Sequence, residues 1–420
     1  MALRIITLLF FFFTSLELLY GQTELEVLQQ QLIEIKKKET EIANQIEDLK
    51  LKSSIVKLNE LGIPISKNVL DIAQHSAMIL GFDCDSKLAA WSFHVLSPDV
   101  LIGGVSRTND FRRDSLVDCG DGVEQDYFTK KLQDDGTYKF ENFGFDRGHL
   151  APSADFRWSQ KALSESYFYS NMTPQRPGFN RESWAEVEDL MRRIMANTPK
   201  PYYIITGPIL DKNLPKVEKG VNKLPVPAFH YKIIADVSPE NPKGMAFLMP
   251  NKKCDLPPSA YVVTIDSIEK LTGLDFFSKI DVTNAQKIES KADFSLWNAQ
   301  TKEGDVEPLY VFDLPKGHFN TAQALSKVGS KVSIIGKVVS AKFAAKSQAT
   351  FLNLDQSFPH QLFTVTIWKD ARRNFSYKPE DDLNGKYIVV TGLVEMDKNG
   401  LPVINVTNEK QIKLWEEEEE

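Results

Sequence analysis

The residues between positions 144 and 188 combine an imidazole, guanidinium groups, carboxamides and a carboxylate. A free imidazole titrates near neutral pH, so His149 could take a proton from water if a neighbour fixed its tautomer. Arg147 lies two residues earlier, on the same side of an extended chain, and its planar cation suits phosphate oxygens. Gly148, which lacks a Cβ, would let a substrate approach the backbone. Together these groups predict a phosphodiesterase site.

Two side chains farther along the chain could hold a divalent metal ion. Asn180 begins a segment with apolar residues at helical spacing, and a carboxamide oxygen plus several waters is a common way to hold Mg²⁺. Glu188 follows eight residues later. On an ideal helix this separation corresponds to a rotation of about 80°, so both side chains could face one cleft. The carboxylate could then hold a metal-bound water.

Each of these residues also has a structural interpretation. A single histidine is more often structural than catalytic, Asn180 could be only a helix N-cap, and Glu188 could be only an i,i+4 partner of Arg192. The joint spacing favours the catalytic interpretation. The chain has no Gly-rich phosphate-binding loop and no G-x-S-x-G motif, so the sequence does not support a nucleotide-driven motor or an α/β-hydrolase.

The pattern as a whole resembles the DNA/RNA non-specific endonuclease family, the ββα-metal nucleases that include endonuclease G and secreted bacterial nucleases. The resemblance covers roughly residues 70–285. It is carried by Asp-Arg-Gly-His at 146–149, by the segments 151–155 and 170–175, and by the series Asn180, Trp184, Glu188.

By this resemblance His149 is the general base of a metal-dependent endonuclease acting on DNA and RNA. Asn180 would be the direct ligand of Mg²⁺, with Mn²⁺ as an alternative ion, and Glu188 would act on the metal through water.

The resemblance also implies groups that support the site and its phosphate, namely Asn171 and Arg147. The family uses a further arginine upstream, in a segment similar to residues 106–112 here. We assign that role to Arg107, with Arg112 as the alternative.

The beginning of the chain has the features of an export signal. A basic start at residues 1–4 precedes the apolar run Ile5–Phe13, and a short tail ends at Gly21. Residues 1–21 are therefore predicted to be a cleaved signal peptide, which implies a secreted, periplasmic or cell-surface protein. An uncleaved anchor is the alternative.

Residues 22–61 are predicted to form one amphipathic helix. Seam positions alternate in steps of three and four and are apolar except at Glu39 and Ser53, which is typical of a coiled-coil seam and allows a homodimer through residues 23–58. The alternative is a helix folded back on the next domain. The seam consists of Leu25, Leu28, Leu32, Ile35, Ile42, Ile46, Leu49 and Val56.

Residues 62–300 are predicted to be an α+β nuclease domain. Short apolar runs separated by turn residues indicate strands without a regular βαβ alternation, and a helix is expected from about Asp266 to Gly273. The predicted strands are Ala77–Phe82, Leu88–Leu96, Tyr202–Ile209, Phe229–Val237, Met245–Pro250 and Tyr261–Ile265.

After a linker at 301–317, residues 318–415 are predicted to form a small all-β barrel similar to an OB-fold, with an unspecified β-sandwich as the alternative. The chain has a net charge of −7, but residues 316–415 contain 14 Lys and Arg against 8 Asp and Glu. Aromatic residues lie among these cations, so we predict nucleic-acid binding, although most of the aromatics could be core residues. They are Phe351, Phe363, Trp368, Phe375 and Tyr377. An acidic tail follows at 416–420.

Three cysteines, at 84, 119 and 254, allow at most one intramolecular disulfide with one thiol left over, and their spacing does not suggest zinc. Two functions remain. The first is an exported endonuclease, and the second is an inactive protein that keeps the fold and gathers partners through the helix and the barrel.

Overall fold

The structure is a computed structural model that describes residues 2–297, 305–306, 308–309, 314–358, 361–398 and 400–415, with side chains from residue 26 onward. It divides into two compact units, Met1–Ser53 and Ser54–Glu420. Much of the predicted linker at 301–317 and all of the acidic tail at 416–420 lie outside the described residues.

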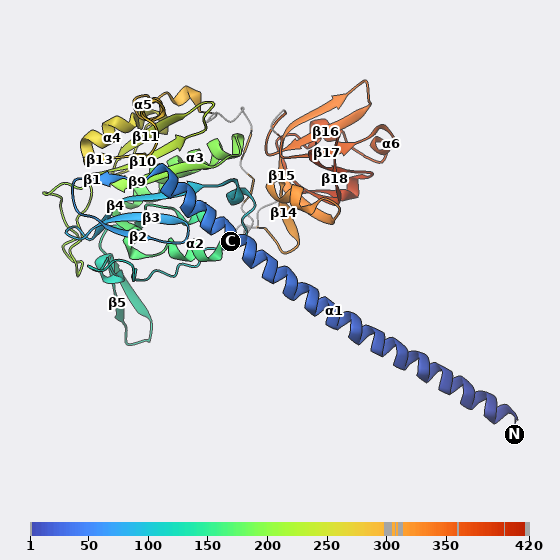
Figure 1. The fold of residues 1–420 in the computed structure, drawn as a ribbon. Coiled ribbons are helices and arrows are strands. Elements are labelled where there is room, and N and C mark those ends of the chain that lie inside the picture. Colours follow the sequence, from blue (N-terminus) through green and yellow to red (C-terminus); the bar gives the residue numbers. More distant parts are fainter. Residues whose placement is uncertain are drawn as a thin grey trace. The chain divides into compact units, whose positions relative to one another are not determined.

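The N-terminal helix, α1 (Ala2–Leu61), contains the whole segment predicted to be helical (Figure 1). It ends before Gly62, whose φ of +84° belongs to the left-handed region that glycine tolerates. The described seam residues from Leu28 to Leu49 are between 48% and 65% exposed, whereas Leu58 is fully buried in a core of the second unit. Among the described residues, no helix is apolar enough over a sufficient length to cross a membrane.

A seven-stranded antiparallel sheet forms the centre of the nuclease domain, in the order β12-β11-β10-β9-β4-β3-β2. The predicted strands are present, including the hairpin of β3 and β4. The bounds are β2 (Asp71–Gln74), β3 (Met78–Asp83), β4 (Leu88–Leu96), β9 (Tyr202–Pro208), β10 (Phe229–Asp236), β11 (Lys243–Pro250) and β12 (Val262–Val263).

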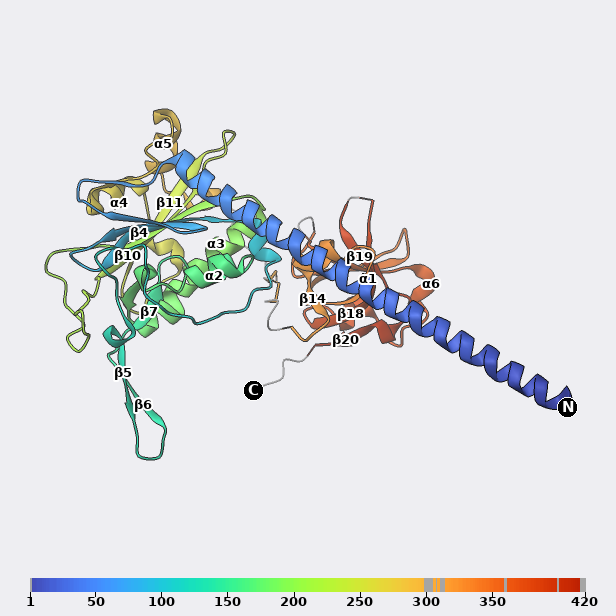
Figure 2. The same cartoon turned by 60° about the horizontal axis from the view of Figure 1, so that its bottom comes forward.

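Each face of this sheet is covered by helices, because successive side chains of a strand point to opposite faces. In β10, Ile233 packs into a core with α4 (Ile265–Thr272) and α5 (Val282–Glu289), while Ile234 packs into a second core with α3 (Ala185–Asn197) (Figure 2). The end of α4 at Gly273, which adopts φ +72°, agrees with the predicted helix stop.

Several short elements surround the sheet and were not predicted. They include two further two-stranded ribbons, β5–β6 and β7–β8, and the pair β1–β13. Their bounds, with that of the short helix α2, are β1 (Ile65–Ser66), β5 (Phe128–Leu132), β6 (Tyr138–Asn142), β7 (Asp146–His149), β8 (Met172–Gln175), β13 (Leu274–Asp275) and α2 (Gln160–Glu165).

The C-terminal domain is a small closed barrel with its own apolar core. Strands pair around the cycle β15-β16-β17-β19-β18 and back to β15, with β17 and β19 parallel and the other pairs antiparallel. The bounds are β14 (His318–Asn320), β15 (Lys331–Ala344), β16 (Ala349–Leu354), β17 (Phe363–Ile367), α6 (Lys369–Arg372), α7 (Pro379–Asp382), β18 (Tyr387–Met396), β19 (Pro402–Asn405) and β20 (Ile412–Leu414).

Most aromatic side chains proposed as a base-stacking platform of the barrel belong to its core. Phe363 is fully buried, and Phe375 and Tyr377 pack against the core cluster. Trp368 is 50% exposed, although its indole N–H donates to Asn405 Oδ1 at 2.8 Å. One disulfide, Cys84–Cys119, is present in the nuclease domain and Cys254 is a free thiol, as the cysteine count allowed.

Candidate active site

The site is built on an antiparallel ribbon and the helix that follows it. Strand β7 pairs with β8 so that His149 lies opposite Met172 and Gly148 opposite Thr173. The chain then forms a π-helical turn, η5 (Phe179–Trp184), which continues directly into α3. Because β7 is extended, Arg147 and His149 share one side of the strand, as the sequence predicted.

Gly148 is required for a different reason from the one expected. A Cβ at this position would lie 2.0 Å from Cδ of the Gln175 side chain, which is fully buried. The close approach is therefore made by the protein's own side chain. The approach of a substrate to this backbone stays a prediction.

His149 is held by aromatic packing. Its ring centroid lies 5.0 Å from that of Tyr167 in an edge-on arrangement and 5.9 Å from that of Phe111. Its Nε2 atom is buried and has no hydrogen-bond partner among the described residues. In the described part of the chain, no carboxylate therefore fixes the tautomer of His149 through a hydrogen bond to Nε2.

The pKa of His149 is lowered to about 3, first by burial and then by the positive charges of Arg107, Arg147 and Lys232. The expectation that this imidazole titrates near neutrality is wrong. With this lowered pKa the ring is neutral at physiological pH and can accept a proton, and the same shift makes it a weaker base than a free imidazole.

The contacts of Arg107 and Arg112 distinguish these two candidates for the predicted upstream arginine. Arg107 Nε donates to the Tyr167 hydroxyl at 3.1 Å, and its charge acts on His149. Arg112 instead donates to Asp110 Oδ2 and to the Ser164 carbonyl, both at 2.8 Å. The geometry favours Arg107 as the site residue, because Arg112 is engaged in holding loops together.

Arg147 is placed by aromatic rings. Its Cζ lies 3.6 Å from the ring centroid of Phe111 and 5.3 Å from that of Phe128. Arg147 also forms a hydrogen bond with the Tyr169 hydroxyl, so the rings and this hydroxyl together orient the guanidinium, whose planar shape suits phosphate oxygens.

Asn171 positions the chain beside the histidine. It is fully buried, and its Oδ1 accepts from Ala151 N at 3.0 Å. Its Nδ2 donates to the carbonyls of Ala151 and Ser166, each at 2.9 Å. Since the backbone uses both ends of this carboxamide, Asn171 acts on the site through the segment that follows His149.

Asn180 is the second residue of the π turn, and Gly178 occupies the N-cap position. The N-cap interpretation of Asn180 is therefore wrong. Its Nδ2 donates to Asp146 Oδ2 at 3.0 Å, and Arg181 holds the same carboxylate with Nη2 at 2.7 Å from Oδ1. Among the described residues, none donates a hydrogen bond to Asn180 Oδ1. An oriented carboxamide oxygen of this kind fits a hard divalent cation.

Glu188 pairs with Lys232, whose Nζ lies 3.5 Å from Glu188 Oε1. Burial raises the pKa of this carboxyl, while the positive charge of Lys232 opposes the rise. Arg192 forms its ion pairs with Asp155, at 2.9 Å, and with Asp189. Arg192 still acts on Glu188 through its charge, which lowers the pKa of that carboxyl, as the i,i+4 spacing allowed.

Lys232 was missed in the sequence and links several parts of the site. It is 1% exposed, and its Nζ donates to the Leu150 carbonyl at 3.2 Å and to Thr206 Oγ1 at 3.0 Å. One cation thus contacts both Glu188 and the residue after His149. The sequence did contain a signal for this lysine, because Lys232 lies in a mostly apolar strand. Its side chain is on the same face of β10 as those of His230 and Ile234, and all three are buried.

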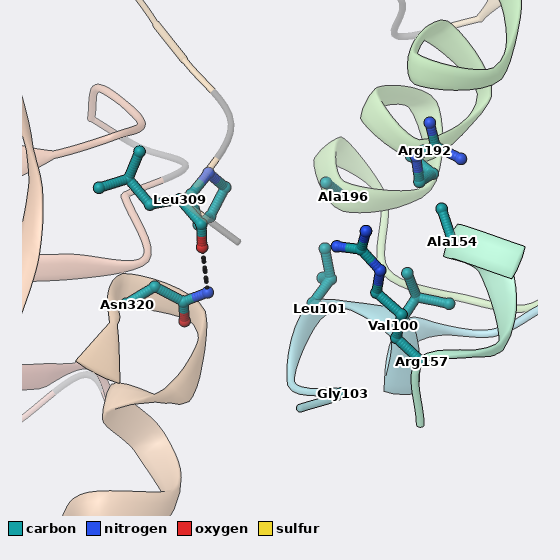
Figure 3. A pocket seen from close by; sticks show the side chains of 10 residues that line it. Val100, Leu101, Gly103, Ala154, Arg157, Arg192, Ala196, Leu309 and Asn320 are labelled. Atoms are coloured by element: carbon teal, nitrogen blue, oxygen red, sulfur yellow. Dashed lines mark hydrogen bonds between the residues drawn. The ribbon is translucent and has the colours of Figure 1, made fainter. Parts of the chain in front are cut away.

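A buried ionic group lies next to this lysine. Asp155 accepts from His94 Nε2 and Arg192 Nη1, at 3.0 and 2.9 Å. Figure 3 shows Arg192 on α3 beside Ala154 and Arg157, where these residues line a small pocket. None of the predicted site residues lines that pocket, so it is separate from the groups around His149.

Comparison with known proteins identifies the relatives of this arrangement. The nuclease of Syncephalastrum racemosum is 32% identical over 250 residues, which are 54% of this chain and 72% of that protein. Mitochondrial endonuclease G of Bos taurus is 30% identical over 238 residues, 53% of this chain and 73% of that protein. A solved structure of the EndoG/EndoGI complex matches 57% of this chain and 97% of its own chain, at 25% identity and a TM-score of 0.43.

The family model described as DNA/RNA non-specific endonuclease matches residues 59–283, more than half of the chain. This range contains both β7–β8 and α3, and with them all the groups around His149. The chain therefore belongs to the DNA/RNA non-specific endonuclease family and is an enzyme of the nuclease class.

Proposed function

We propose that this protein is a Mg²⁺-dependent, sugar-non-specific endonuclease that hydrolyses phosphodiester bonds of DNA and RNA. Membership of the family implies a divalent metal ion. The observation that carries the proposal is the half-buried imidazole of His149 beside Arg107 and Arg147, two cations suited to a phosphate. Asn180 supports the metal role because its carboxamide is oriented by Asp146.

In the proposed reaction His149 accepts the proton of the attacking water, since it is neutral at physiological pH. Arg147 and Arg107 stabilise the negative charge that grows on the phosphate oxygens. Asn180 Oδ1 would hold the metal ion directly and Glu188 would hold it through water, with Lys232 orienting that carboxylate. When bound, a divalent ion supplies Lewis-acid polarisation of the phosphate and stabilises the leaving oxygen.

A nicking assay on supercoiled plasmid and on a structured RNA tests this proposal. We expect cleavage of both substrates with Mg²⁺ and complete loss with EDTA, and the addition of Mg²⁺ or Mn²⁺ should restore it. The competing function is a catalytically inactive protein that binds nucleic acid or other partners. Binding without cleavage at any metal concentration would establish that alternative and refute ours.

We also propose that the C-terminal barrel, residues 318–415, is an OB-type domain that grips nucleic acid. The strand cycle of five members supports an OB-type barrel. Its cations support the binding role, since every Lys and Arg described between 316 and 415 keeps contact with solvent.

For the N-terminal region we propose a cleaved signal peptide over residues 1–21, export, and a homodimer through residues 23–58. The disulfide Cys84–Cys119 supports an oxidising compartment, and the exposed seam of α1 supports a partner helix. N-terminal sequencing of the mature protein tests the cleavage. Sedimentation of chains beginning at residue 22 and at residue 50 tests the dimer, which only the longer chain should form, and the shorter chain keeps the buried Leu58.

A further inference from the structure

The hairpin of β5 and β6 projects from the nuclease domain (Figures 1 and 2) and takes no part in the proposed chemistry. In its register Lys130 lies opposite Phe140 and Leu132 opposite Tyr138. Because side chains alternate along a strand, these four residues share one face with Phe128. The other face is polar and carries Thr129, Lys131, Lys139 and Glu141.

The first face exposes large apolar groups to solvent. Leu132, Tyr138 and Phe140 are 64%, 58% and 59% exposed. The rings of Phe128 and Phe140 lie 5.9 Å apart, and Lys130 Nζ lies 6.0 Å from each ring centroid. The same Nζ forms an ion pair with Glu124 Oε1 at 2.8 Å. Aromatic rings interleaved with a cation are the components of a platform for nucleic-acid bases and their phosphates.

This face is continuous with the active site. Arg147, which shares β7 with His149, packs its guanidinium between Phe128 and Phe111. Phe111 in turn contacts the ring of His149. A nucleic-acid strand with one phosphate at Arg147 would therefore meet the hairpin face next.

We propose that the β5–β6 face stacks on unpaired bases of the strand that is being cleaved, which would make unpaired segments the preferred substrate. This inference rests on the proposed nuclease function. Bases in a duplex are already stacked within their own helix and offer no free face to the protein. The two exposed rings of this face, Tyr138 and Phe140, could each take one unpaired base.

Binding is measured on the full chain carrying His149→Ala, so that substrate is not consumed. The probes are a fluorescently labelled 12-nucleotide single strand and the duplex of the same sequence. Onto this parent we place Tyr138→Ala with Phe140→Ala. A matched control is Leu271→Ala, which removes an equally exposed apolar side chain from α4. A second control is Lys139→Ala, on the polar face of the hairpin.

The double variant should bind the single strand at least fivefold more weakly and the duplex within twofold of the parent. Its dependence on salt should be unchanged, because stacking releases no counterions. Lys130→Ala removes a cation that must leave its partner Glu124 to meet a phosphate, so it should reduce the salt slope by at most about 0.7. Both controls should match the parent.

Three results would overturn the inference. The first is an unchanged affinity of the double variant for the single strand, and the second is an equal loss of affinity for single strand and duplex. The third is an unchanged affinity together with a halved sedimentation mass of the double variant, which would assign the face to a second copy of the chain. The proposed function is tested separately by hydrolysis of bis(4-nitrophenyl) phosphate by the chain with His149 intact, a reaction that needs no stacking. A parent that binds neither probe, while the chain with His149 intact hydrolyses bis(4-nitrophenyl) phosphate, would overturn the stacking inference and leave the proposed function standing.

Discussion

The nuclease domain and the C-terminal barrel place their charges differently. Among the described residues, the buried charged side chains of the nuclease domain include Lys232, Arg192 and Asp155, whereas the only one in the barrel is Asp355. Burying charge is costly unless it is paired and hydrogen-bonded, so the nuclease domain gives up stability to hold its groups in place. The barrel keeps its cations in water, where they can attract phosphates but cannot perform chemistry.

The largest expected effect is on the buried base. His149→Ala should lower cleavage of DNA and RNA by about 10²–10⁴-fold, since general-base assistance is lost. The matched control is His318→Ala in the barrel, which should stay within twofold. Plasmid nicking by the alanine variant within tenfold of wild type would remove His149 from the mechanism.

Substitutions of Asn180 and Glu188 should differ in their effect on activity, because Asn180 is the proposed direct metal ligand and Glu188 is proposed to act through water. Asn180→Ala is expected to be nearly inactive, because the direct ligand is gone. Glu188→Gln should keep more activity and need more Mg²⁺. Calorimetric titration of Mg²⁺ gives a readout independent of cleavage, and undiminished Mg²⁺ binding by Asn180→Ala would contradict the assignment.

The free-energy cost of a buried charge can be measured at Lys232. Lys232→Met leaves Glu188 without its partner and should lower the free energy of unfolding by about 3–5 kcal/mol. The double variant Lys232→Met with Glu188→Gln should recover part of that loss. Lys342→Met in the barrel, where Lys342 is exposed, should change the free energy of unfolding by less than about 0.5 kcal/mol. Equal effects of Lys232→Met and Lys342→Met would erase the contrast between the domains.

A smaller effect is expected from pH. With the pKa of His149 lowered to about 3, kcat/KM should not rise through its titration between pH 6 and 8, contrary to the expectation from a free imidazole. Arg107→Met should move the acid limb to higher pH, because one of the charges lowering this pKa is removed. The unfolded state binds more protons between about pH 3 and 6.5, so this histidine lowers stability as pH falls through that window. A limb near pH 6.5 in wild type would show that the burial is not retained in solution.

The smallest effect on cleavage should come from the barrel. A chain ending near Lys316 should cleave short substrates as wild type does, because every candidate catalytic residue lies in the nuclease domain. It should bind long single strands less tightly, and its salt slope should be shallower by about 0.7 for each phosphate that the barrel would otherwise bind. The partly exposed Trp368 is the side chain to test singly. Filter binding of the 318–415 fragment at two salt concentrations is the direct measurement, and no binding at low salt would contradict the proposed grip.

Much of the fold follows from local patterns. The strand hairpin of β3 and β4, the helix end at Gly273 and the small all-β domain were predicted, because alternation and turn residues act over a few positions. The β5–β6 hairpin was not, since its sequence mixes charged and apolar residues without a buried face. The β7–β8 pairing was missed because its strands are only four residues long and their partners are distant in sequence.

The sequence by itself determined which groups could do chemistry, because the motif from Asp146 to Glu188 is compact along the chain. Only the tertiary structure decided the protonation and the partners of those groups. The lowered pKa of His149, the choice of Arg107 over Arg112 and the pairing of Glu188 with Lys232 each depend on residues brought together from separate elements. Solvation and electrostatic interaction vary with distance in space and with burial, and neither is encoded in spacing along the chain.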